Sequence, residues 1–129
     1  MRAEPLNEIS ALLEELDACQ EDGSTRSALL IRLLVEEGHD RHEDIVFELG
    51  LIGDSAAVPA IAKAVHMPFP ELVRWHNLHA FQRKCAYALA RIGTEDSRRV
   101  LEELAADEDE YLREYGKEGL EHWPMPFKE

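Results

Sequence analysis

The chain has 129 residues, of which 45% are hydrophobic and 32% are charged, and its formal net charge is −13. This length suits one domain with a continuous core, and the composition argues against a disordered chain. The longest apolar run, Ala28 to Val35, is interrupted by Arg32. It falls short of the roughly 20 apolar residues that span a bilayer, so we expect no membrane association.

The cysteines and the first residues indicate the compartment. Cys19 and Cys85 occupy apolar positions of helical patterns, where buried free thiols are typical. The segment from Met1 to Pro5 lacks the apolar stretch of a secretory signal. We therefore expect a cytoplasmic protein.

Charge is distributed in blocks along the sequence. Residues 1–54 carry 14 acids and 4 bases, residues 55–101 carry 3 acids and 7 bases, and residues 102–121 carry 9 acids and 2 bases. Such an acidic chain repels a phosphate backbone, so nucleic-acid binding is not expected. The acids suit a basic protein partner, because complementary charge speeds encounter, although they equally serve solubility.

Apolar spacing is helical along nearly the whole chain. The predicted helices cover about residues 6–20, 24–37, 41–51, 56–66, 78–92, 95–106 and 108–122. Gly38, Gly53 and Gly93 follow predicted helix ends, where glycine is a favoured residue. Pro59 falls in the first turn of its helix, where the missing N–H costs little.

Prolines mark the remaining boundaries. Met67-Pro68-Phe69-Pro70 opens a long connection over residues 67–77, because two closely spaced prolines do not continue a helix. Pro124 and Pro126 end regular structure. We expect Trp123, Met125 and Phe127 to cap the C-terminal end of the core.

An internal repeat is visible in the second half of the chain. Residues 48–55 align with residues 88–95 at a spacing of 40, and each segment contains a helix end, a glycine turn and a second helix start. Residues 112–116 align with residues 82–86 at a spacing of 30. Repeats of two antiparallel helices describe an α-solenoid, in which each unit buries its apolar face against its neighbours.

Residues 41–122 resemble HEAT repeats, in particular the short bacterial type found in phycobilisome lyases. The motif Arg-x-x-Ala-x-x-x-Leu-x-x-Ile-Gly is nearly matched by Arg83, Ala86, Leu89 (one residue early), Ile92 and Gly93. The motif Asp-x-x-Ala-Val-Pro-x-Ile is matched by Asp54, Ala57, Val58, Pro59 and Ile61. The resemblance implies an all-α, HEAT-like α-solenoid of about three helical-hairpin repeats in a single domain, 1–129. Its parts are a degenerate capping hairpin (1–38), a repeat (41–66), a Pro-rich insertion (67–77), a repeat (78–106) and a C-terminal half-repeat (108–123).

Arg41-His42-Glu43 resembles the His-Glu motif of helical-repeat di-iron hydroxylases that modify a lysine on a translation factor. In that family several His-Glu pairs converge on two irons, which imidazole and carboxylate suit. The equivalent positions here fall at Gln82 to Lys84 and at Arg113-Glu114, where cations would repel a metal. We therefore expect neither a metal nor another cofactor, and His42 and Glu43 remain the candidate metal ligands.

Two histidine pairs, His39 with His42 and His76 with His79, have the three-residue spacing that places two imidazoles on one side of a helix. Surface histidines near helix ends are the alternative interpretation. No glycine-rich phosphate loop, Cys-x-x-Cys or Gly-x-Ser-x-Gly elbow is present in the sequence. The sequence therefore predicts no catalytic residue.

A binding surface is the preferred prediction. In a HEAT solenoid the second helix of each unit lines the concave face, which would carry Lys63, Arg98, Arg99, Glu102 and Glu103. Insertions in repeat proteins often map to the binding face, and aromatic residues dominate interface hot spots, so Phe69 and Trp75 are candidate anchors. The alternative is that both fold back into the gap between repeats.

The sequence thus predicts a monomeric, non-catalytic protein-binding module. Small acidic HEAT proteins resemble immunity proteins, which would make this chain an inhibitor of a basic toxin or enzyme. The alternatives are a degenerate HEAT-repeat enzyme, similar to a di-iron hydroxylase or a lyase, and a nucleic-acid-binding helical-repeat protein similar to the alkylation-repair glycosylases. The latter would use the basic residues of the central segment with Trp75.

Overall fold

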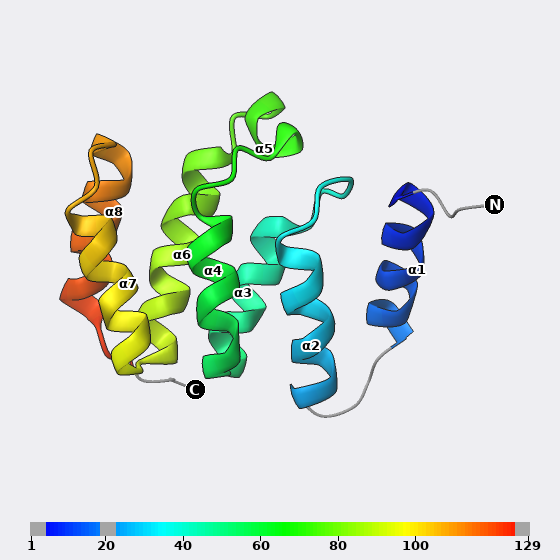
Figure 1. The fold of residues 1–129 in the computed structure, drawn as a ribbon, viewed down its shortest axis with the longest axis horizontal. Coiled ribbons are helices and arrows are strands. Elements are labelled where there is room, and N and C mark those ends of the chain that lie inside the picture. The colour runs from blue at the N-terminus through cyan, green and yellow to red at the C-terminus, as the bar shows by residue number, and fades with distance from the viewer. Residues whose placement is uncertain (1–4, 19–22, 126–129) are drawn as a thin grey trace.

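The computed structural model describes residues 5–18 and 23–125, which form α-helices, one 3-10 turn and no strand. The all-α prediction is confirmed for this part of the chain. The elements are α1 (Pro5–Ala18), α2 (Gly23–Leu34), α3 (His42–Ile52), η1 (Ser55–Ala57), α4 (Val58–Ala64), α5 (Pro70–Arg74), α6 (Leu78–Ile92), α7 (Glu95–Ala105) and α8 (Glu110–His122), as Figure 1 shows. Among the described helices none is both long and apolar enough to cross a bilayer.

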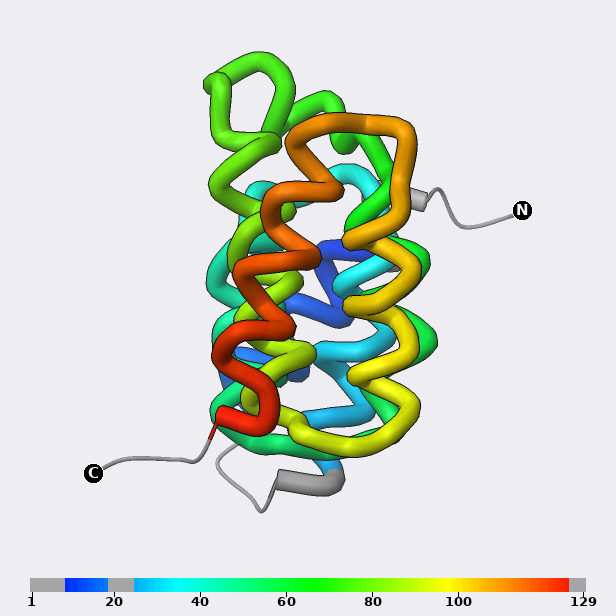
Figure 2. The backbone as a smooth tube through the Cα atoms, turned by 90° about the vertical axis from the view of Figure 1, so that its left-hand side faces the viewer, coloured from blue at the N-terminus to red at the C-terminus, as the bar shows by residue number. Residues whose placement is uncertain are grey.

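The helices stack side by side in two layers. One layer contains α3, α6 and α8, the other contains α2, α4 and α7, and α1 packs against α2 at the N-terminal end (Figures 1 and 2). Successive helices alternate between the layers, so each hairpin buries its apolar side against the next. The arrangement is a row of stacked hairpins, and its assignment to the HEAT family stays a prediction.

Equivalent turns end α3 and α6, forty residues apart. Gly53 and Gly93 adopt φ values of 76° and 71°, and each donates its N–H to the carbonyl four residues earlier, at 3.0 and 3.2 Å. A polar residue follows each glycine and caps the next element: Asp54 accepts the Ala56 N–H, and Thr94 accepts the Ser97 N–H. The glycine turn and the capping hydrogen bond therefore repeat at the same spacing as the sequence.

The Pro-rich segment differs from the long connection expected over residues 67–77. Pro70 begins the short helix α5, since its fixed φ suits a first helical position. Phe69 is 0% exposed and packs on Phe81, with ring centroids 5.8 Å apart. The prediction that Phe69 anchors a partner is wrong, because this ring fills the core between repeats.

The C-terminal cap is confirmed for the described residues. The Trp123 indole N–H donates to the Thr94 carbonyl at 3.2 Å and to Ser97 Oγ at 3.1 Å. Met125 packs against the core and donates its N–H to the Ala90 carbonyl at 2.8 Å. Phe127 and Cys19 lie outside the described residues, and Cys85 is fully buried, which raises the pKa of its thiol.

Small residues set the distance between neighbouring helices. A methyl group added at Gly116 of α8 would stand 2.4 Å from the Ala105 backbone nitrogen, at the end of α7. One added at Gly50 of α3 would stand 3.0 Å from the Ala88 Cα in α6. These helices approach one another at backbone contact, which leaves no room for a side chain.

We predict that Gly116→Ala destabilises the protein by about 2 kcal/mol or more, because α8 must move away from α7. Helix propensity alone would favour this substitution by about 1 kcal/mol, so the sign of the effect separates packing from propensity. Urea unfolding measures the difference. The control is Lys117→Ala at the exposed neighbouring position, which should change the free energy of unfolding by less than about 0.5 kcal/mol.

Candidate functional site

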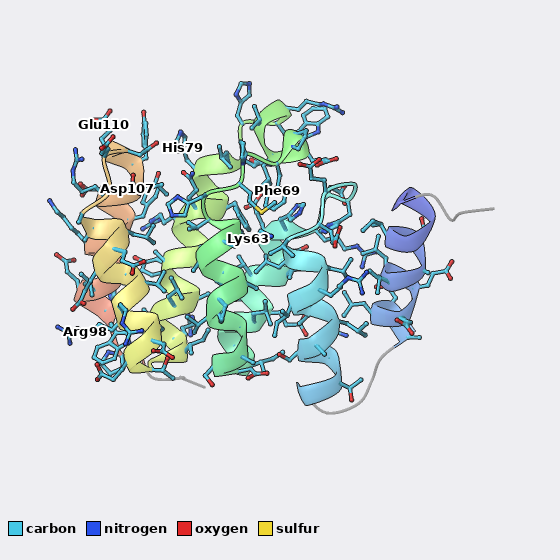
Figure 3. The ribbon with its side chains drawn as sticks, in the orientation of Figure 1. Lys63, Phe69, His79, Arg98, Asp107 and Glu110 are labelled. Atoms are coloured by element: carbon cyan, nitrogen blue, oxygen red, sulfur yellow. The ribbon has the colours of Figure 1, made fainter. Side chains whose placement is uncertain are left out.

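Three connections between helices lie at one end of the stack, the upper end in Figure 1. They span residues 35–41, 65–77 and 106–110, and we call this end the acidic edge. Its acids are Glu36, Glu37, Asp40, Glu71, Asp107, Glu108, Asp109 and Glu110, and its bases are Arg41 and Arg74. Figure 3 places Asp107, Glu110 and His79 at this end. The acidic blocks of the sequence therefore contribute to one continuous margin of the fold.

A hollow of about 530 Å³ opens at this edge between the 35–41 connection and α5. We call it the acidic hollow. It is lined by Ile9, Val35, Glu36, Glu37, Gly38, Met67 and Glu71. Three carboxylates therefore surround an apolar floor.

The carboxylates of the acidic hollow differ in how they are paired. Glu36 lies 3.7 Å from Arg32, a long ion pair between exposed side chains. Glu71 has a buried oxygen, Oε1, that accepts no hydrogen bond from any described residue. Burying a carboxylate oxygen without a donor is costly.

Stacked rings support the acidic hollow from behind. His42 is 0% exposed, and its ring stacks between His39 and Phe69, with centroid distances of 4.1 and 3.8 Å. Its Nε2–H donates to the Glu36 carbonyl at 2.7 Å, which fixes the backbone of one acidic residue in the hollow. Burial, opposed in part by this hydrogen bond, lowers the pKa of His42 to about 4.

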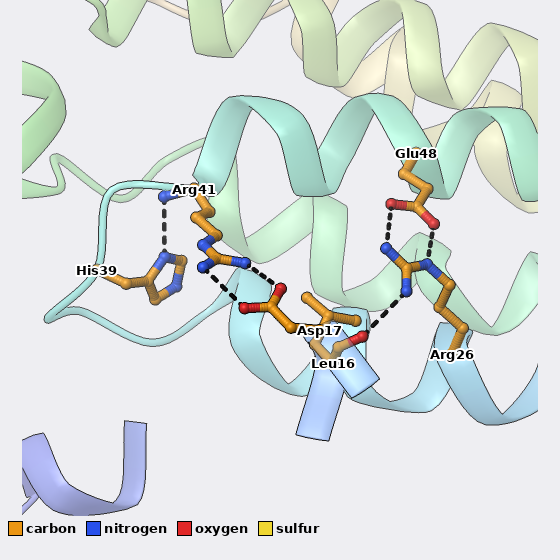
Figure 4. Close-up of polar contacts among 6 residues, drawn as sticks. All are labelled: Leu16, Asp17, Arg26, His39, Arg41 and Glu48. Carbon is orange, nitrogen blue, oxygen red and sulfur yellow. Dashed lines mark hydrogen bonds and ion pairs between the residues drawn. The ribbon is translucent and has the colours of Figure 1, made fainter. Parts of the chain in front are cut away.

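Polar contacts hold α1 in place and so complete the wall that Ile9 provides (Figure 4). Arg41 forms two hydrogen bonds to the Asp17 carboxylate, at 2.8 and 3.2 Å, which lower the pKa of Asp17. Arg26 pairs with Glu48 on α3 and also donates to the Leu16 carbonyl of α1 at 3.1 Å. These bonds join α1 to the two helices that follow it.

The structure does not bring the two metal candidates together. His42 points into the core, whereas Glu43 pairs with Lys84 of α6 at 3.0 Å. Among the described residues no three His, Cys, Asp or Glu side chains are grouped as a metal site. In the second histidine pair, the His79 ring stacks on Tyr111 with centroids 4.0 Å apart, and His76 and His79 line one hollow together.

The other predicted contact residues fall on two separate surfaces. Trp75 is 68% exposed at the acidic edge, close in sequence to Val73, which is 48% exposed. Lys63, Arg98, Arg99, Glu102 and Glu103 lie on α4 and α7, and Figure 3 shows Arg98 far from the acidic edge. On α7, Arg98 pairs with Glu102 at 3.0 Å and lies over the Trp123 ring, and Arg99 pairs with Asp96 at 2.9 Å. The charges predicted to contact a partner are thus partly neutralised within their own helix.

Comparisons with protein-family models, curated proteins and solved structures give no match to this chain. The acidic hollow is not visible in the sequence, because a pair such as Glu36-Glu37 is typical of a solvated helix face. Glu36 and Glu37 follow the end of α2, whereas Glu71 lies in α5, and only the fold brings the three residues to one hollow.

We predict that the protein loses about 2 kcal/mol of stability between pH 7 and pH 5 through His42. Its folded-state pKa is about 4 and its unfolded value is 6.5, so the unfolded chain takes up the proton first as the pH falls. The loss begins near pH 6.5 and ends below pH 4. Urea unfolding at each pH measures it.

Two variants test this assignment. His42→Phe removes the titrating group and should flatten the change in unfolding free energy between pH 7 and pH 5, whatever its effect on absolute stability. His66→Gln, at an exposed histidine, should leave the change as in the parent protein. An unaltered slope in His42→Phe would refute the assignment.

Proposed function

We propose that this chain is a non-catalytic protein-binding module whose acidic edge receives a basic partner. The observation that supports this most is the acidic hollow, where three carboxylates stand over an apolar floor. One of them, Glu71, has a buried oxygen without a donor among the described residues. A lysine or arginine of the partner would bring a cation to these carboxylates.

The shape of the acidic hollow suits a long basic side chain. Lysine and arginine bury their methylene stems along apolar surface and keep the charged head among polar groups. Ile9, Val35 and Met67 provide the apolar surface, and Glu36, Glu37 and Glu71 provide acceptors. A volume of about 530 Å³ accommodates such a side chain together with part of its backbone.

The remainder of the acidic edge would increase the affinity for the partner and the rate of association with it. Trp75 and Tyr111 are 68% and 48% exposed, and aromatic residues are enriched among interface hot spots. The acids at residues 107–110 extend the negative potential along the edge, which would steer a basic partner toward the hollow. Among these, Asp109 also caps α8, since it accepts the N–H groups of Tyr111 and Leu112.

The more specific form of this proposal is an inhibitor, or immunity protein, that covers the active site of a basic toxin or enzyme. A net charge of −13 on a small all-α chain favours this form, since inhibitors of basic enzymes gain speed and selectivity from charge complementarity. Its test is protection: co-expression with the product of a neighbouring toxin gene should restore growth. If none of the neighbouring toxin candidates is neutralised, the inhibitor proposal is rejected. The more general proposal of a protein-binding module is tested separately, by peptide binding.

We predict that a synthetic peptide of alternating glycine and lysine binds at the acidic hollow. Titration followed by amide NMR should shift resonances of residues 35–38 and 67–71 more than others. Glu71→Gln keeps the shape of the side chain but removes its charge, so it should weaken binding at least threefold. Raising the salt from 50 to 300 mM should weaken binding further.

A matched control distinguishes binding at the acidic hollow from attraction by the net charge of the protein. Glu121→Gln changes the net charge equally, at an exposed position in the last turn of α8, the end of that helix away from the acidic edge. It should leave the peptide affinity within a factor of 1.5. Equal weakening by both variants, or shifts spread evenly over the molecule, would contradict the proposed site.

A further inference from the structure

A second concave surface lies on the layer formed by α3, α6 and α8. It is a groove of about 290 Å³ between α3 and α6, and we call it the α3–α6 groove. It is lined by Phe47, Ala80, Arg83, Lys84, Tyr87, Ala88 and Arg91. All of these except Phe47 belong to α6, at spacings that place them along one side of that helix. The acidic hollow shares none of these residues.

The floor and one wall of the α3–α6 groove are apolar. Phe47 is 50% exposed, whereas Phe69 and Phe81 are fully buried. Leu51, one turn further along α3, is 44% exposed beside it. Ala80 and Ala88 leave space above α6 because their side chains are short. The groove thus offers a flat apolar surface bounded by the rings of Phe47 and Tyr87.

The cations around the α3–α6 groove are not equivalent. Arg83 forms a two-point contact with Glu118 of α8, at 3.1 Å from Nε and 2.7 Å from Nη2, and Tyr87 donates to the same carboxylate at 2.6 Å. Lys84 pairs with Glu43 at 3.0 Å. These pairs fix the two side chains at the groove and leave them neutralised.

Arg91 has no such partner. It is half-buried, and within the described residues no carboxylate pairs with it and no hydrogen bond from it is found. Its side chain lies close to Gly50, where an added methyl would stand 3.5 Å from the Arg91 Cδ. Arg91 is therefore a cation at the groove that no described carboxylate neutralises, in a chain with 27 acids.

We propose that the α3–α6 groove binds a small organic carboxylate with a flat apolar body, its carboxylate on Arg91 and its body between Phe47 and Tyr87. The planar guanidinium presents two parallel donors that match a carboxylate. A volume of about 290 Å³ fits a bicyclic body rather than a long chain. One unpaired cation balances one negative charge, which favours a monocarboxylate. This inference goes beyond the protein-binding function and does not depend on it.

The experiment uses 1-naphthylacetate and its neutral amide as a matched pair of probes. Titration of the full chain, followed by amide NMR, should give a dissociation constant on the order of 1 mM for the carboxylate, as expected for a ligand of this size. Shifts should concentrate at residues 47–51 and 80–91. The amide should bind at least fivefold more weakly.

Three variants locate the site. Arg91→Gln should weaken naphthylacetate at least fivefold, and Ala80→Leu, at an exposed position in the groove, should do the same by filling space. Lys63→Gln removes an exposed cation from α4 in the other layer and should leave binding unchanged. Each variant is first compared with the parent protein by its amide spectrum, and Ala80→Leu supplies the test should Arg91→Gln not fold.

Several results would overturn the proposal. These are equal binding of acid and amide, equal weakening by Arg91→Gln and Lys63→Gln, and shifts that avoid the groove. The proposal would also fail if the protein formed a dimer that Phe47→Ala abolishes and did not bind naphthylacetate. A second copy of the chain would then occupy the groove. Sedimentation of the parent protein and of Phe47→Ala distinguishes that case.

Discussion

The close approach of helices at small residues governs this structure. Gly50 lies against Ala88 where α3 meets α6, and Gly116 lies against the end of α7 where α8 packs on it. Backbones in contact leave a thin two-layer stack with a narrow core, so long side chains cannot be placed between these helices. They lie at the ends of the stack and on its outer faces, and so do the acidic hollow and the α3–α6 groove.

In the same stacked arrangement, acidic and basic segments of the sequence form ion pairs between neighbouring helices. Basic α6 lies between acidic α3 and α8, so Lys84 reaches Glu43 on one side and Arg83 reaches Glu118 on the other. Exposed ion pairs of this kind contribute little stability each, about 0 to 1 kcal/mol, but they fix side-chain positions. Among the charges outside these ion pairs are acids at the edge, and Arg91 at a groove.

The fold was predictable where local chemistry decides it. Helical spacing over residues 78–92 coincides with α6, and the glycine turns at Gly53 and Gly93 form as the repeat predicts. The candidate site was not predictable, because it joins residues from separate connections. Phe69 shows why: an aromatic residue between two prolines has the same local pattern whether its ring meets a partner or fills the core, and only packing against Phe81 decides between them.

His42 links the core to the acidic hollow. Its ring is stacked in the core, while its Nε2–H holds the carbonyl of Glu36, whose carboxylate lines the hollow. A neutral imidazole can fill this position, since a charged one would be desolvated beside Phe69. The residue that resembled a metal ligand in the sequence therefore has a structural role, because its hydrogen bond orients the backbone beneath two adjacent acids. The geometry of the hollow therefore depends on core packing through this one ring.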